Sequence, residues 1–173
     1  MDTVQISVTV NGRQTGPHTI PASLAMIDFL HEYLGLTGTK FGCGVGVCHA
    51  CVVIVDEPDG TSRAMRTCIN GAADFSGKRV RTVEWHAKQD RLSDVQQAFV
   101  DHFAFQCGYC TSGYVNAATC LLEDLARNPV SRTAVEERIE TSLGDHLCRC
   151  TGYVRYYEAV RDLILADPQL TKR

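Results

Sequence analysis

The residues best suited to chemistry in this sequence are cysteines, and their densest group lies between Gly42 and Cys51. Cys43, Cys48 and Cys51 follow a C-x4-C-x2-C spacing, which holds a plant-type [2Fe–2S] cluster when a fourth thiolate follows. Cys68 is the only cysteine between this loop and the second half of the chain, so we predict that it is the fourth ligand. The chemistry that this group indicates is one-electron transfer.

Three glycines in the same loop, Gly42, Gly44 and Gly46, suit such a cluster. Two ferric ions, two sulfides and four thiolates sum to a formal charge of about 2−, which inward-pointing backbone N–H groups must offset. Glycine reaches positive φ and lets the backbone curl closely, so we predict that these three shape the cluster loop. A glycine-rich turn with buried cysteines and a zinc site are the alternatives. Zinc sites favour paired C-x2–4-C knuckles, whereas an x4 loop that contains several glycines suits a cluster wider than one ion.

A second cysteine group lies further along the chain, as the pairs Cys107-x2-Cys110 and Cys148-x-Cys150. Each pair sits just before a predicted helix, whose N-terminus would present N–H groups and partial positive charge to an anionic cluster. These pairs alone also suit a structural zinc ion, but the first motif favours a second [2Fe–2S] cluster because two adjacent clusters make an electron path. We predict that Cys120 is a small core residue.

Composition narrows the class of protein. Eight of the nine cysteines fall into two groups, and Cys120 is left over. An odd count with tight C-x2-C and C-x-C pairs is typical of metal ligation rather than of disulfides. The formal net charge is −3 without a Lys- or Arg-rich tract, which argues against a nucleic acid or anionic membrane partner. We expect no signal peptide and no membrane span, hence a cytoplasmic chain, or a periplasmic one if a signal-bearing partner exports it. No catalytic constellation emerges, so we expect no substrate chemistry on this chain.

The first half of the chain has the pattern of a small α+β unit. Alternating apolar residues over 4–10, a turn at Asn11-Gly12 and a return over 13–20 predict a β-hairpin. A helix capped by Ser23 and ended by Gly35 should follow. We expect three further strands, at residues 51–55, 63–67 and 78–84.

The second half has helical periodicity. Residues 85–91 are mostly polar and indicate a linker. We expect four helices after it: one opened by the capping box of Ser93 and Gln96 and running down to Cys107, then residues 110–127, a short helix after Thr133, and residues 153–166. Small residues on one face of the second helix should let another helix approach closely; they are Gly113, Ala117 and Cys120.

Four stretches carry a family resemblance: residues 34–43, the loop to Cys51, Gln106 to Thr111, and Leu147 to Tyr153. Together they resemble the iron–sulfur subunit of the molybdenum hydroxylases, of the xanthine dehydrogenase, aldehyde oxidoreductase and isoquinoline oxidoreductase type. The resemblance covers nearly the whole chain in order. It implies an α+β fold with a ferredoxin-like β-grasp [2Fe–2S] domain over residues 1–84, a linker over 85–91, and a four-helix-bundle [2Fe–2S] domain over 92–173.

The same resemblance implies a function and a direction for the electrons. A separate large subunit would hold molybdenum on a pterin, the molybdopterin cofactor, and oxidise an aldehyde or an N-heterocycle. The cluster of Cys107, Cys110, Cys148 and Cys150 would lie nearest the pterin, with Gln106 and Cys150 as contact candidates. The first cysteine group would pass electrons outward to a flavoprotein, a cytochrome c or a ferredoxin. A zinc-stapled binding module and a free-standing ferredoxin are the alternative functions.

Three positions depart from the family pattern. His49 stands where glycine is usual, Ser112 where proline is usual, and Asp145-His146 where Gly-Asn is common. Rieske-type ligation by His49 would need two histidines in C-x-H and C-x2-H pairs, which this sequence lacks. We therefore predict that His49 is a neighbour of the first cluster, either solvated or tuning its potential.

Overall fold

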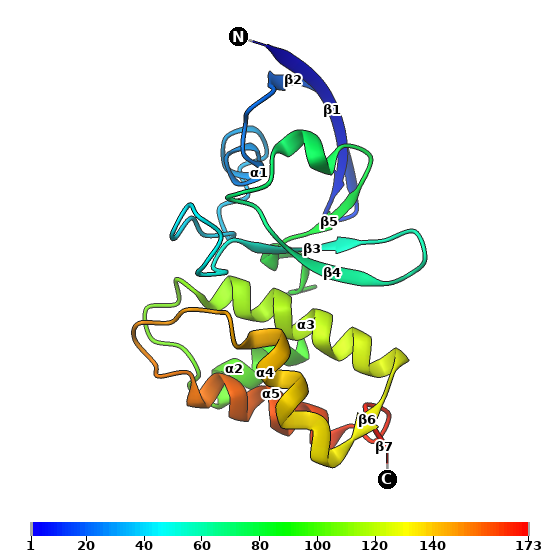
Figure 1. Ribbon diagram of the computed structural model, residues 1–173, viewed down its shortest axis with the longest axis vertical. Helices are drawn as coiled ribbons and strands as arrows, with labels where there is room; N and C mark the ends of the chain where they lie inside the picture. The colour runs from blue at the N-terminus through cyan, green and yellow to red at the C-terminus, as the bar shows by residue number, and fades with distance from the viewer. Residues whose placement is uncertain (1, 173) are drawn as a thin grey trace.

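The computed structural model describes residues 2–172 and has a sheet half above a helical half (Figure 1). This is the α+β arrangement that the sequence predicts. The strands and helices, in chain order, are β1 (Thr3–Val10), β2 (Arg13–Pro21), α1 (Met26–Asp28), β3 (Val52–Asp56), β4 (Ser62–Arg66), β5 (Arg79–Arg81), α2 (Asp94–Asp101), α3 (Thr111–Arg127), β6 (Val130–Ser131), α4 (Val135–Leu143), α5 (Val154–Ala166) and β7 (Thr171–Lys172).

The sheet half is built on five strands in the order β2-β1-β5-β3-β4. The predicted hairpin of β1 and β2 forms, and its turn residues Asn11 and Gly12 have positive φ values of 51° and 76°. β5 lies in the middle of the sheet, parallel to β1 and antiparallel to β3. It is shorter than the predicted strand, because the chain turns into a 3-10 helix over Val83–Trp85.

The helix predicted between Ser23 and Gly35 begins later than expected, and the Ser23 cap is wrong. Ala25 is the N-cap and makes no side-chain cap; α1 is three residues long and continues as a π-helical turn over Phe29–Tyr33. Before the helix starts, the chain pairs with a distant segment: Ala25 forms a β-bridge with Gly71. Tertiary pairing therefore replaces the local cap.

The helical half contains the four predicted helices, α2 to α5. The capping box of α2 forms: Ser93 Oγ accepts from Gln96 N at 3.3 Å and Gln96 Oε1 accepts from Ser93 N at 3.0 Å. The helix ends at Asp101, well before Cys107, and Phe103 has a positive φ of 49° with its side chain 74% exposed. The prediction that this helix runs to Cys107 is therefore wrong.

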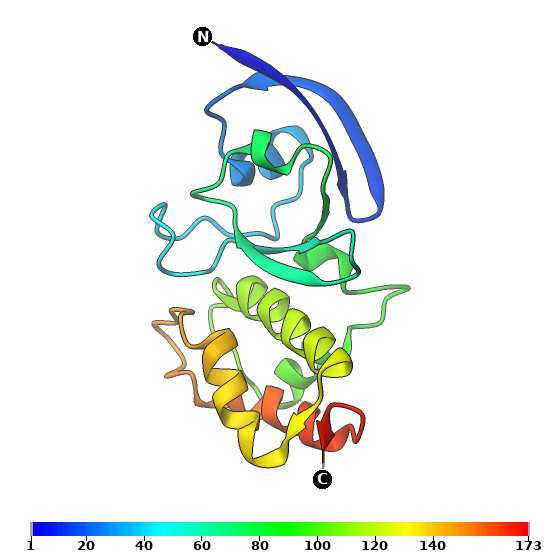
Figure 2. The same cartoon turned by 45° about the vertical axis from the view of Figure 1, so that its right-hand side comes forward.

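Helix α3 lies between the two halves, along β3 and β4 (Figures 1 and 2). The small residue Gly113 faces the backbone of residues 49 and 50, which belong to the sheet half. A small-residue face was predicted to admit another helix; it admits the sheet half instead. An ion pair completes the contact, because Arg81 of β5 donates to Glu123 of α3 at 2.6 Å.

The predicted linker packs against both halves. His86 is buried, and its Nε2 lies 2.7 Å from Oδ1 of Asn116 in α3. On the sheet side, the Trp85 ring lies against the hairpin turn, because a Cβ atom at Gly12 would lie 3.0 Å from its Cη2 atom. The domain limits at residues 84 and 92 stay a prediction. No helix within residues 2–172 is both long and apolar enough to span a membrane.

Candidate metal centres

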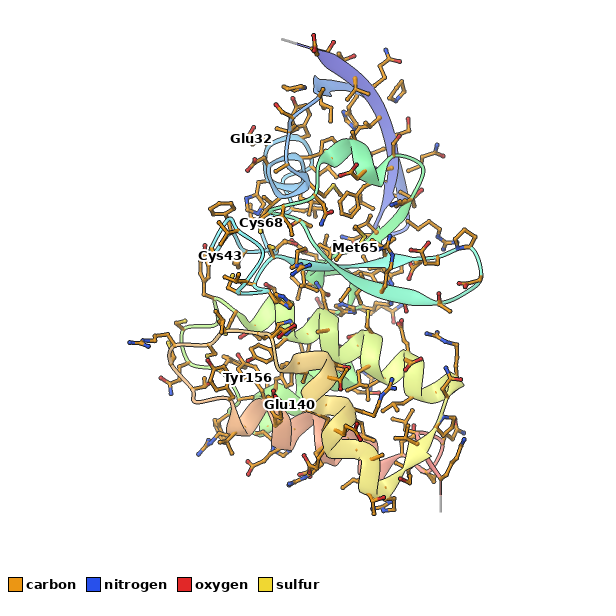
Figure 3. All side chains as sticks on the ribbon, viewed as in Figure 1. Glu32, Cys43, Met65, Cys68, Glu140 and Tyr156 are labelled. Atoms are coloured by element: carbon orange, nitrogen blue, oxygen red, sulfur yellow. The ribbon has the colours of Figure 1, made fainter. Side chains whose placement is uncertain are left out.

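The first cysteine group gathers beside the sheet as two pairs of thiols. Cys43 contacts Cys48, and Cys51 contacts Cys68, while the charges of Cys43 and Cys68 are close enough to interact. Figure 3 shows Cys43 and Cys68 near one another at the same edge of the sheet half. The structure thus brings together the four cysteines that the spacing predicts.

The glycines of this loop have two different roles. Gly44 and Gly46 have positive φ values of 71° and 75°, as predicted. Gly42 does not have positive φ; a Cβ atom there would lie 2.8 Å from Cys48 Sγ, so this position needs glycine for close approach. His49 also has positive φ, 58°, which explains why glycine is favourable at this position.

Backbone N–H groups favour the charged form of this site. The N–H of Val45 is the main reason that the pKa of Cys43 falls to about 6, with further N–H groups of Val47 and Cys48 helping. Burial raises the pKa of Cys68 to about 11, and the thiol of Cys51 beside it adds to this. Cysteine binds metal as a thiolate, so the inward N–H groups provide the compensation that an anionic cluster requires.

The second group forms across two loops, again as two pairs. Sγ of Cys107 and Sγ of Cys150 are 3.6 Å apart, and Cys110 contacts Cys148. The pairs therefore join one residue of each motif. Cys110 is the N-cap of α3, as the helix-terminus argument predicts, whereas α5 begins after Tyr153, beyond the other motif.

Hydrogen-bond donors surround this second group unevenly. Burial opposes ionisation of Cys148, but the Thr151 hydroxyl, 3.0 Å from its Sγ, and nearby N–H groups outweigh burial and lower its pKa. Burial raises the pKa of Cys110 to about 12. Its Sγ lies 3.8 Å from the hydroxyl of Tyr156, a buried residue of α5 labelled in Figure 3.

This donor set fits two-iron clusters. A [2Fe–2S] cluster takes four thiolates, two for each iron, and each group offers two thiol pairs. Within residues 2–172, no three His, Cys, Asp or Glu side chains are arranged to hold a single metal ion. A cavity of about 270 Å³ lies between the groups, and its cysteine lining is Cys43, Cys48, Cys107, Cys110, Cys148 and Cys150.

One hydrogen bond joins the two groups directly. The N–H of Leu147 donates to the carbonyl oxygen of Cys48 at 3.1 Å, and Leu147 is followed in the chain by Cys148. A second bond runs alongside, from the Tyr109 hydroxyl to the Phe41 carbonyl at 2.6 Å. In both views the two loops lie on the same side of the molecule (Figures 1 and 2).

A column of rings between the groups was missed by sequence reasoning. The ring centres of His49 and His146 are 5.1 Å apart, those of His146 and Tyr114 4.7 Å, and those of Tyr114 and Tyr156 4.1 Å. Burial lowers the pKa of His146 to about 4, so this ring is neutral near pH 7. The sequence carried a signal for the first contact, since His49 and His146 depart from the family pattern together.

The remaining residues singled out in the sequence are either exposed to solvent or lie outside both thiol groups. Gln106, Cys107 and Cys150 are exposed. Cys120 belongs to neither thiol group, and burial raises its pKa to about 12, which suits the predicted packing role.

Two family models match the chain, one on each half. The model described as "2Fe-2S iron-sulfur cluster binding domain" matches residues 8–74, and "[2Fe-2S] binding domain" matches residues 82–161. The nicotine 6-hydroxylase small subunit of Paenarthrobacter nicotinovorans is 41% identical over 93% of this chain and 90% of its own length. The xanthine dehydrogenase iron-sulfur-binding subunit of Escherichia coli O157:H7 is 40% identical over 93% and 94%. The chain belongs to the iron–sulfur subunits of the molybdenum hydroxylases.

A solved structure agrees with this membership. Quinoline 2-oxidoreductase from Pseudomonas putida 86 matches with a TM-score of 0.77 and 35% identity, over 97% of this chain and 93% of that chain. This iron–sulfur subunit is an electron-transfer subunit of an oxidoreductase and carries two [2Fe–2S] clusters. Its relatives are subunits of larger enzymes with a catalytic subunit that carries molybdopterin. The predicted family, fold class and cofactors are thereby confirmed.

Proposed function

We propose that the two thiol groups are the ligand sets of the two clusters. Cluster 1 is held by Cys43, Cys48, Cys51 and Cys68. Cluster 2 is held by Cys107, Cys110, Cys148 and Cys150. The contacts between Cys43 and Cys48 and between Cys107 and Cys150 support this assignment, because each such pair suits one iron. When bound, each cluster takes up and releases one electron at a time.

We infer that electrons enter at cluster 2. Its exposed ligands Cys107 and Cys150 lie next to exposed Gln106, which supports their predicted contact with the pterin of the large subunit. Several apolar side chains within a few residues of these ligands in the sequence face solvent, which suits an interface for a partner. These are Phe103 (74% exposed), Phe105 (39%), Tyr109 (49%), Leu147 (52%) and Val154 (60%).

Electrons leave, in this proposal, through cluster 1. Its loop and the residues next to its ligands also present apolar side chains to solvent: Phe41, Val45, Val47 and Ile69. This second surface suits an acceptor, either a flavoprotein or cytochrome c subunit or a ferredoxin. The names of the relatives mention nicotine and xanthine, and that of the solved structure quinoline, so the enzyme's substrate is an N-heterocycle, or an aldehyde as in other family members.

The observation that carries the proposal is the hydrogen bond between Leu147 N and Cys48 O. This hydrogen bond connects Cys48, a ligand of cluster 1, to Leu147, the residue that precedes Cys148 of cluster 2. Such a connection shortens the path of an electron between two clusters, whereas it has no role in a binding module held together by zinc. We place the complex in the cytoplasm, or in the periplasm if a signal-bearing partner exports it.

Purification of the intact complex without air tests the proposal. We expect red-brown protein with iron and sulfide, and two distinct electron paramagnetic resonance (EPR) signals after reduction by substrate. Cell fractionation in the same experiment locates the complex, and the co-purified chains identify the acceptor. Colourless protein that contains zinc and gives no signal would contradict the assignment of both sites.

A further inference from the structure

The backbone of the cluster 1 loop is held from outside by the helical half. Three backbone carbonyl groups, two in this loop and one at the first residue of β3, accept hydrogen bonds from the helical half. A carbonyl group that is removed from water needs such a donor. The bonds are Leu147 N to Cys48 O at 3.1 Å, Ser112 Oγ to Ala50 O at 3.3 Å, and Asn116 Nδ2 to Val52 O at 2.7 Å.

Two of these donors depend on particular side chains of α3. Ser112 stands where the family pattern has proline, and its hydroxyl donates to Ala50 O, which a proline side chain could not do. Asn116 is fully buried, and His86 orients it, because Nε2 of His86 donates to the Asn116 carbonyl oxygen at 2.7 Å and leaves the amide to face Val52. The face of α3 that packs against the cluster 1 loop therefore makes polar contacts whose donors are held in fixed orientations.

Gly113 stands between these two donors, at the point of closest approach. A Cβ atom there would lie 2.2 Å from the His49 carbonyl oxygen, 3.1 Å from its carbon and 3.2 Å from Ala50 Cα. All three are backbone atoms, which cannot rotate away as a side chain can. The φ of Gly113 is not positive, so space and not conformation requires glycine here.

Any side chain at this position has to push the loop and the helix apart. Ordinary contact between a Cβ and its neighbours needs about 3.5 Å, so the loop backbone and α3 have to move apart by on the order of 1 Å. Cys48 lies next to His49 in the loop, and Cys110 precedes Gly113 by less than one helical turn. Moving the loop away from α3 would thus increase the distance between ligands of the two clusters.

We propose that Gly113 is a positioning residue for electron transfer, which sets the separation of cluster 1 and cluster 2 by letting α3 lie directly on the backbone of His49 and Ala50. This inference rests on the ligand sets proposed above. Electron transfer between fixed centres slows steeply with distance, and the magnetic coupling between two reduced clusters falls with the inverse cube of their separation. Both quantities therefore report on this contact.

The test is Gly113→Ala in the complete complex, with Gly71→Ala as a matched control. A Cβ at Gly71 meets only Asp74 Oδ2 at 3.5 Å and Leu24 O at 3.8 Å, so nothing there has to move. Iron content, the EPR signals, the splitting between the two reduced clusters and the rate of electron passage from cluster 2 to cluster 1 are measured in both variants and in the wild type.

We expect Gly113→Ala to keep both clusters, to lose part of the splitting and to pass electrons several-fold more slowly, while Gly71→Ala behaves as the wild type does. A Gly113→Ala complex with both clusters, wild-type splitting and wild-type rate overturns the inference. Wild-type protein without two iron signals would instead overturn the ligand sets, so the two failures are distinguishable.

A second variant covers the case in which Gly113→Ala fails to hold cluster 1. Asn116→Ala loosens the same contact one helical turn further on, without adding an atom, by removing the donor to Val52. We expect a smaller loss of splitting in the same direction. Unchanged splitting in this variant, with both clusters bound, overturns the inference.

Discussion

The two cysteine groups are assembled in different ways. Three of the four cysteines proposed for cluster 1 lie within one short loop, where Gly44 and Gly46 supply the required backbone turns. The cysteines proposed for cluster 2 come from two motifs with 37 residues between Cys110 and Cys148. The first site is therefore largely local, whereas the second exists only because the helices of its half pack together.

The difference shows what each site depends on. Cluster 2 needs the packed helical core, where Tyr114 and Tyr156 stack face to face with an interplanar angle of 5°. Cluster 1 needs little packing for its ligands, but its loop takes hydrogen bonds from the helical half through Leu147 and Asn116. Damage to the helical core should thus reach cluster 2 first and cluster 1 second.

The largest expected effect follows from removing one thiolate. We expect Cys148→Ser to abolish the EPR signal of cluster 2 and to keep that of cluster 1, because no ligand is shared between the sites. Substrate oxidation should then be uncoupled from the acceptor. Cys120→Ser is the matched control and should keep both signals; loss of a cluster in the control would overturn the ligand assignment.

The second-largest effect is expected from a substitution that creates a cavity in the helical core. Tyr156→Ala removes a fully buried ring and should lower the free energy of unfolding by about 3–5 kcal/mol and weaken cluster 2 first. Tyr156→Phe loses only the hydroxyl that lies 2.7 Å from Thr111 Oγ1, at a cost of about 1 kcal/mol. Denaturant unfolding followed at both EPR signals measures this. Loss of cluster 1 before cluster 2 would contradict the comparison.

A pH effect probes the contact between the halves. Burial lowers the pKa of His86 below its ordinary 6.5, although its bond to Asn116 opposes this. The folded state therefore favours neutral His86. The stabilisation that neutral His86 gives to the folded state is complete above pH 6.5 and is lost as the pH falls from there through the lowered pKa. We expect wild-type stability to fall as the pH drops below 6.5 more steeply than that of His86→Gln, which cannot titrate.

Unfolding of both proteins at several pH values gives the two slopes. The two proteins share every other titratable group, so the difference between the slopes isolates His86. Equal slopes would show that its burial contributes no pH dependence.

The smallest expected effect separates the two clusters by charge. The Arg66 guanidinium donates to Gly46 O in the cluster 1 loop at 2.9 Å, whereas Arg63, on the same strand, pairs with Glu57. We expect Arg66→Gln to lower the reduction potential of cluster 1, because a positive charge favours the reduced state, and to leave cluster 2 unchanged. Arg66 is solvent-exposed, so screening keeps the shift small. In an EPR-monitored titration, Arg63→Gln should match the wild type; equal shifts in both variants would exclude a local effect.

Much of the fold was predictable because its signals are local. The hairpin turn at Asn11-Gly12 and the capping box of Ser93 with Gln96 each depend on residues within a few positions of one another. The start of α1 was not predictable in this way, because the bridge between Ala25 and Gly71 joins segments far apart in the chain.

The sequence by itself determined the chemistry, since cysteine type and spacing specify which clusters the chain can hold. The tertiary structure decided how these sites relate: the pairing of Cys107 with Cys150, the burial of His146, and the closeness of Gly113 to His49. The physical reason is that periodicity reports which face of an element is apolar or small, but not what packs against that face. Only the packed chain shows that the neighbour of α3 is the loop of the first cluster.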